Sequence, residues 1–91
     1  MRRLEGKRAI VTGAGRGFGA EIAELFARQG ARVVASDVDG ASADATARRI
    51  VEAGGEALSV QADVTSAGDA ERLTGVVGER LGGLDVLVNN A

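Results

Sequence analysis

A glycine-rich turn connects the first apolar run of this chain to its first helical segment. Residues 9–12 (AIVT) are apolar and β-branched enough for a strand that is buried on both faces. They lead at once into TGAGRGFG at residues 12–19, after which apolar side chains recur at helical spacing. A strand that turns directly into a helix leaves the first helical N–H groups unpaired. Those groups and the helix dipole favour a phosphate, so the turn predicts a phosphate-binding site rather than a flexible surface loop.

Apolar runs and alanine-rich segments alternate along the rest of the chain. Strands are predicted at residues 9–12, 32–36, 57–62 and 84–88. The first predicted helix ends at Gly30. The second has Asp39 or Ser42 as its N-terminal cap and ends at Gly54. The third starts at a capping box, residues 66–69, and ends at Gly82. The predicted inward-facing side chains are Phe18, Ile22, Leu25 and Phe26, then Ala43, Ala47, Ile50 and Val51, then Ala70, Leu73, Val77 and Leu81. The order β-α-β-α-β-α-β predicts an α/β fold with a parallel sheet and right-handed crossovers.

The composition excludes several kinds of chemistry. The 91 residues contain no Cys, His, Tyr, Trp or Pro, and only one Lys. A disulfide framework, a thiolate metal site and a catalytic Cys or His are therefore excluded, and no metal site is predicted. The net charge of -2 gives no support for a nucleic-acid surface. No apolar run is long enough for a signal peptide or a membrane span, so a cytoplasmic location is expected.

Asp37 is the second feature of a nucleotide site. It follows the second predicted strand and lies 18 residues beyond Gly19. A carboxylate about 20 residues beyond a glycine motif accepts hydrogen bonds from the ribose of a bound dinucleotide. A solvated turn residue or a helix cap is the alternative, and the nearby Asp39 also suits that role. Together with the glycine turn, the position of Asp37 favours ribose binding.

Four motifs in order make the chain resemble the N-terminal part of a short-chain dehydrogenase/reductase with a TGxxxGxG turn. They are LEGKRAIV at residues 4–11, TGAGRGFG at 12–19, DVT at 63–65 and LDVLVNNA at 84–91. The resemblance covers essentially the whole chain and implies a doubly wound Rossmann fold with strand order 3-2-1-4. Residues 1–91 would then be a partial NAD(P)-binding domain that stops after its fourth strand.

The resemblance also implies roles for individual residues. The pyrophosphate and the adenosine ribose would lie along Gly13, Gly15, Arg16, Gly17 and Phe18, while Gly19 would allow close helix–strand packing. Asp37 would hold the ribose hydroxyls, Asp63 the adenine amino group with Val64 beside it, and Asn90 would lie by the nicotinamide-side ribose. Asn89 would steady the fourth strand. The purely structural alternatives are a turn or cap role for Asp63 and ordinary core packing for Phe18.

The preferred cofactor is a question of charge. A carboxylate at Asp37 would repel a 2′-phosphate, which favours NAD over NADP. Arg16 opposes this, because the family often uses a basic residue there to attract that phosphate. A salt bridge between Arg16 and Asp37 would neutralise both effects. We expect NAD, because Asp37 can hold both ribose hydroxyls while Arg16 turns toward solvent.

The catalytic residues that the family implies are missing from this chain. They are a Tyr, a Lys four positions later, a Ser and a further Asn; the chain has no Tyr, and its one Lys, Lys7, precedes the first strand. The chain by itself is therefore expected to be inactive. It would be the dinucleotide-binding portion of an NAD(P)-dependent oxidoreductase that interconverts an alcohol and a carbonyl on a small molecule, and whose complete form is a homo-oligomer.

Two alternatives to an oxidoreductase portion stay open. One is a free-standing nucleotide-binding half-domain without chemistry. The other is a methyltransferase-like domain, which the motifs at residues 12–13 and 89–91 disfavour. In a complete sheet the fourth strand would also pair with a fifth, so in this chain we expect a bare apolar edge that promotes self-association.

Overall fold

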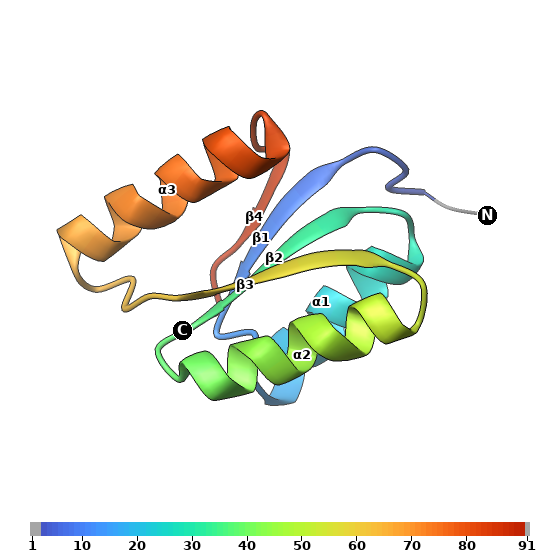
Figure 1. Ribbon diagram of the computed structural model, residues 1–91, viewed down its shortest axis with the longest axis horizontal. Coiled ribbons are helices and arrows are strands. Elements are labelled where there is room, and N and C mark those ends of the chain that lie inside the picture. Colours follow the sequence, from blue (N-terminus) through green and yellow to red (C-terminus); the bar gives the residue numbers. More distant parts are fainter. Residues whose placement is uncertain (1–2, 91) are drawn as a thin grey trace.

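A computed structural model describes residues 3–90 and shows a four-stranded parallel sheet with three helices. The strand order β3-β2-β1-β4 confirms the predicted fold class and topology. Helices α1 and α2 cover one face of the sheet and α3 covers the other (Figure 1). The elements are β1 (Arg8–Thr12), α1 (Gly17–Arg28), β2 (Arg32–Asp37), α2 (Gly40–Glu52), β3 (Glu56–Gln61), α3 (Ala67–Leu81) and β4 (Val86–Val88).

The parallel register brings the carboxyl ends of all four strands to the same end of the sheet. Thr12 at the end of β1 lies opposite Ser36 of β2, and Asp37 lies opposite Gln61 at the end of β3. On the other side of β1, Val11 lies opposite Val88 at the end of β4. The loops that follow these strands therefore meet at one end of the molecule, which is where α/β sheets bind ligands.

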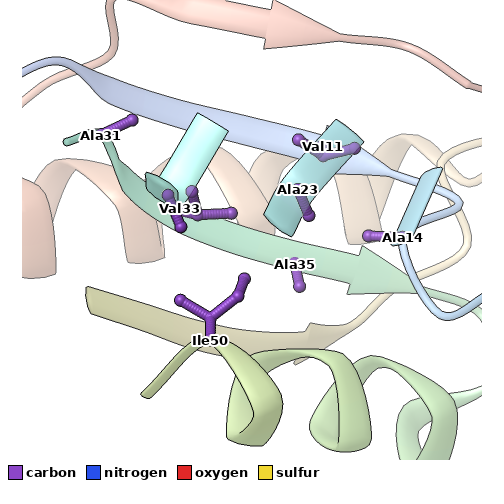
Figure 2. Close-up of a cluster of buried hydrophobic side chains, with 8 residues drawn as sticks. Val11, Ala14, Ala23, Ala31, Val33, Ala35 and Ile50 are labelled. Carbon is purple, nitrogen blue, oxygen red and sulfur yellow. The ribbon is translucent and has the colours of Figure 1, made fainter. Parts of the chain in front are cut away.

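The core between the sheet and helices α1 and α2 is built from small side chains. Figure 2 shows Val11, Val33 and Ala35 of the strands against Ala23 of α1 and Ile50 of α2. Helix α1 buries Gly19, Ala20, Ala23 and Ala27. Because these residues are small, the helix backbone can approach the sheet closely and the larger side chains are left at its flanks.

The predicted burial in the core is therefore wrong for three residues. Phe18 is 77% exposed, and Leu25 and Val51 are also exposed. Ile22 and Phe26 of the same predicted face are half-buried and pack at the margin of the core. The hydrophobic spacing identified the helix correctly, but the face that packs on the sheet is the alanine face beside it.

The opposite face of the sheet carries a second core under α3. Leu73, Val77 and Leu81 are buried against Ile10 and Val34, as the sequence predicts, while Ala70 is only half-buried. None of the helices within residues 3–90 has the combination of length and apolar character needed to cross a membrane.

Candidate functional site

The glycine turn connects β1 to α1 by a path that side chains would block. Gly13 and Gly17 have positive φ angles of 61° and 59°, which L-residues rarely adopt. A Cβ on Gly13 would lie 2.1 Å from the Asn90 carbonyl oxygen, and a Cβ on Gly19 would lie 1.9 Å from the Gly13 carbonyl oxygen. Gly17 has open space around it. The turn therefore packs closely against backbone atoms at Gly13 and Gly19, whereas there is free space beside Gly17 at the start of α1.

The start of α1 lacks the side-chain cap that the other two helices have. Arg16 is its N-cap residue and makes no capping hydrogen bond, and the first turn holds no acidic residue. By contrast, Asp39 caps α2 and Ser66 caps α3. Uncapped N–H groups at a helix start, with the positive end of the helix dipole, are suited to an anion.

The carboxylate of Asp37 ties the end of β2 to this turn. Its Oδ2 accepts a 2.9 Å hydrogen bond from the Gly15 N–H, and its Oδ1 accepts a 3.0 Å bond from the Asp39 N–H. A Cβ on Gly15 would approach that same Asp37 Oδ2 to 2.8 Å and the Cβ of Ser42 to 2.5 Å. Only glycine therefore fits at this position.

Arg16 pairs with Asp39 and not with Asp37. Its guanidinium Nη2 lies 3.1 Å from Asp39 Oδ2. Hydrogen bonds from the side chain and then the backbone of Ser42 lower the pKa of Asp39, with a smaller contribution from Arg16. Asp37 therefore keeps its two backbone partners, and within residues 3–90 it forms no ion pair with a guanidinium.

A cleft of about 240 Å³ opens beside Asp37 on the α3 face of the strand ends. It brings together five predicted site residues from the segments that follow all four strands: Gly13, Asp37, Asp63, Val64 and Asn90. The other residues of its walls are Thr12, Ser36, Val38, Ala62 and Thr65. Gly15, Arg16, Gly17 and Phe18 do not line it and belong to the adjoining turn.

Asp63 has the turn geometry that the sequence left open as an alternative. Its Oδ1 accepts hydrogen bonds from the Thr65 side chain at 2.6 Å and the Thr65 backbone at 2.9 Å, and these bonds lower the pKa of Asp63. Its own N–H donates to the Asp69 carboxylate at 2.8 Å. Asp63 lines the cleft and its Oδ2 takes no part in these bonds, so the turn role leaves one carboxylate oxygen as a further acceptor.

Thr12 fastens the segment after β4 to the turn. Its Oγ1 lies 3.2 Å from Asn89 Oδ1 and accepts a 3.0 Å hydrogen bond from the Asn90 N–H. The Asn90 Nδ2 donates to the Gly13 carbonyl at 3.4 Å. These contacts join the segment after β4 to the end of β1, while Ala91, the last residue of that motif, lies outside the described residues.

Ser36 lines the cleft and was not among the predicted site residues. Its hydroxyl is buried and has no hydrogen-bond partner among the described residues. An unsatisfied buried hydroxyl is unfavourable by about 1–3 kcal/mol. The sequence signal for Ser36 was a polar residue directly after the apolar run at residues 33–35.

The comparison with known sequences decides the family. Residues 7–91 match the short chain dehydrogenase family. The chain belongs to this family. An uncharacterized oxidoreductase of Methylorubrum extorquens is 49% identical over 92 residues, which cover all of this chain and 37% of the relative. The chain therefore spans little more than a third of the length of that relative.

Solved structures of short chain dehydrogenases share this fold closely. A 7α-hydroxysteroid dehydrogenase complexed with NADH and 7-oxo glycochenodeoxycholic acid superposes with a TM-score of 0.96 at 45% identity, covering 98% of this chain and 35% of its own. A metagenomic short-chain oxidoreductase in complex with NADP gives 0.91 at 44% identity, covering 97% and 40%. Both family members hold a nicotinamide dinucleotide.

Proposed function

We propose that this chain binds the adenosine half of a nicotinamide dinucleotide at the strand ends. The observation that carries the proposal is the Gly15–Asp37 hydrogen bond, which joins a phosphate-suited turn to a ribose-suited carboxylate beside a cleft. The uncapped start of α1 and the open space beside Gly17 are compatible with the pyrophosphate of such a ligand. The NADH and NADP complexes of its relatives support the same ligand class.

Each predicted residue has a place in this proposal. The open N–H groups at Gly17 and Phe18 would bind the pyrophosphate, and the exposed Phe18 ring would cover it. Asp37 would accept the ribose hydroxyls. Asp63 Oδ2 and Val64 would receive the adenine on the far wall of the cleft, and Asn90 would lie beside the second ribose. The remaining residues of the proposed site are Gly13, Gly15 and Arg16.

We propose NAD rather than NADP as the preferred cofactor. The ionised carboxylate of Asp37 would repel a 2′-phosphate and bind free hydroxyls. Arg16, the cation that would attract that phosphate, is already paired with Asp39. When bound, the nicotinamide ring accepts or donates a hydride. The family's alcohol–carbonyl chemistry needs a Tyr and a following Lys, which these residues lack, so this chain alone would bind without turnover.

Thermal melting followed by circular dichroism tests the binding proposal. At a concentration 100 times Kd, NAD should raise the free energy of unfolding by about 2.7 kcal/mol. Asp37→Asn is the site variant, and Asp44→Asn on α2, which pairs with Arg48, is a control of equal charge change. A melt that millimolar NAD and NADP both leave unchanged would refute the proposal.

An activity assay separates the oxidoreductase portion from a free-standing binding module. The longer coding sequence should contain a Tyr-x-x-x-Lys segment, and its product should reduce NAD in the presence of an alcohol while the 91-residue chain does not. A coding sequence without that segment would favour the binding module. Size measurements on the longer protein would show whether it forms the homo-oligomer that we propose.

A further inference from the structure

We propose that Asp39 acts as a positioning residue that sets the discrimination against NADP by holding the Arg16 guanidinium away from the ribose site. The inference rests on the proposed dinucleotide function and extends it to a residue that would not itself touch the cofactor. It follows from a network of contacts that connects the starts of α1 and α2.

The ion pair joins two helix N-cap residues. Arg16 is the N-cap of α1 and Asp39 is the N-cap of α2, and their side chains meet at 3.1 Å. The Arg16 side chain is 77% exposed, so its direction depends on this partner rather than on packing. The preceding residue, Gly15, donates its N–H to Asp37, so Arg16 starts from a point close to the ribose-suited carboxylate.

Asp39 is itself fixed from three directions. Its Oδ1 accepts from the Ser42 N–H at 3.2 Å, and its Oδ2 accepts from the Ser42 hydroxyl at 2.8 Å. Its own N–H donates to Asp37 Oδ1 at 3.0 Å. The hydrogen bonds from Ser42 also lower the pKa of Asp39, so they stabilise its charged form. Arg16 is thus paired with an anchored anion.

The pairing has a direct electrostatic consequence. A guanidinium that is free can bind a phosphate through two parallel N–H bonds. While Arg16 is paired with Asp39, a 2′-phosphate at Asp37 would meet two carboxylates and a guanidinium that is already engaged. Removing the charge at Asp39 would release Arg16 and remove one repelling carboxylate, so NADP binding should improve while Asp37 stays in place.

The first experiment is Asp39→Asn. Asparagine is an N-cap as good as aspartate, so α2 should keep its start. Binding of NADH and NADPH is measured by isothermal titration calorimetry, which does not depend on how the nicotinamide end is held. We expect the affinity for NADPH relative to NADH to rise about three- to fivefold, which corresponds to the upper end of the effect of an exposed ion pair. Asp39→Ser, a second uncharged capping residue, should give the same direction of change.

Two controls separate release of Arg16 from a general loss of negative charge. Asp44→Asn removes one charge from the same helix and should leave the NADPH to NADH ratio within twofold. In an Arg16→Gln background, Asp39→Asn should raise the ratio less than it does when Arg16 is present, because only the repelling carboxylate is then removed. An equal effect of Asp39→Asn with and without Arg16, or no effect at all, would overturn the inference.

The same titrations distinguish this inference from the function on which it rests. If the unchanged chain binds neither nucleotide, the proposed function fails and the inference falls with it. If the chain binds NADH but both Asp39 variants keep the original ratio, the proposed function stands and the role of Asp39 alone is refuted.

Discussion

The Gly15 N–H and the Asp37 carboxylate are joined by a hydrogen bond of 2.9 Å that spans 22 positions of the chain. This bond connects the turn after β1 with the end of β2 through the protein's own atoms. Since a Cβ at residue 15 would lie within 2.8 Å of the same carboxylate oxygen, the glycine and the aspartate depend on each other. The proposed ribose acceptor is therefore already oriented by the turn.

The charge of Asp37 should control both affinity and preference. For Asp37→Ala we expect NAD affinity to fall about ten- to a hundredfold, because charge-assisted hydrogen bonds to the ribose would be lost. The preference should shift toward NADP. Asp37→Asn keeps an oxygen for the Gly15 N–H and separates loss of charge from loss of the turn contact. Titration with NADH and NADPH measures both effects, and an unchanged preference in both variants would contradict the assignment.

Two helical glycines should respond in opposite ways to alanine. Gly19→Ala places a Cβ 1.9 Å from the Gly13 carbonyl oxygen, a backbone atom, so we expect the free energy of unfolding to fall by at least about 2 kcal/mol. Gly75 in α3 has nothing within 4 Å of such a Cβ, so Gly75→Ala should stabilise by up to about 1 kcal/mol. Urea unfolding measures the free energy of unfolding of both variants. Equal changes in that free energy would contradict the different packing around Gly19 and Gly75.

The Arg8–Asp85 pair should make stability sensitive to acid. The side chain of Arg8, then its backbone N–H, lowers the pKa of Asp85 to about 2. A lowered pKa adds stability above the unfolded value near 4, and this stability is lost as the pH falls toward 2. The chain should therefore be more stable than Asp85→Asn at pH 6, and the difference should vanish by about pH 2. Melting curves of both proteins across this pH range test the prediction. A stability difference that does not depend on pH would refute it.

Thr46 should be important for holding the glycine turn against α2. Its hydroxyl is buried and donates a 2.8 Å hydrogen bond to the carbonyl of Ala14. Thr46→Val keeps the shape and leaves that carbonyl unsatisfied, so we expect a loss of about 1–3 kcal/mol. Thr46→Ser retains the hydroxyl and should lose less. If chemical unfolding shows that Thr46→Ser is less stable than Thr46→Val, the result would argue against this hydrogen bond.

The outer edge of β4 should promote self-association. Within residues 3–90, β4 is the last strand on its side of the sheet, and Leu84 and Leu87 are exposed there. Unpaired strand edges with apolar side chains join readily to other chains. Leu87→Lys should lower the mean mass observed in sedimentation velocity at a given concentration. A monodisperse monomer of the unchanged chain would contradict this expectation.

The helix faces show where sequence reasoning was limited. Hydrophobic spacing correctly predicted the existence of α1, yet it assigned Phe18 and Leu25 to a core that is instead lined by Ala23 and Ala27. Periodicity measures side-chain character, whereas the packed face depends on how closely the helix backbone approaches the sheet. In α3, where the spacing carries large residues onto the sheet, Leu73 and Val77 were predicted correctly.

The sequence by itself determined the order of the elements, the parallel topology, the glycine turn and the acidic residue after β2, because each depends on local spacing and turn chemistry. The tertiary structure alone decided which groups meet. It paired Arg16 with Asp39 and buried the Ser36 hydroxyl without a hydrogen-bond partner among residues 3–90. These contacts join residues from different strands and helices, and only the register of the sheet and the approach of the helices bring them within reach.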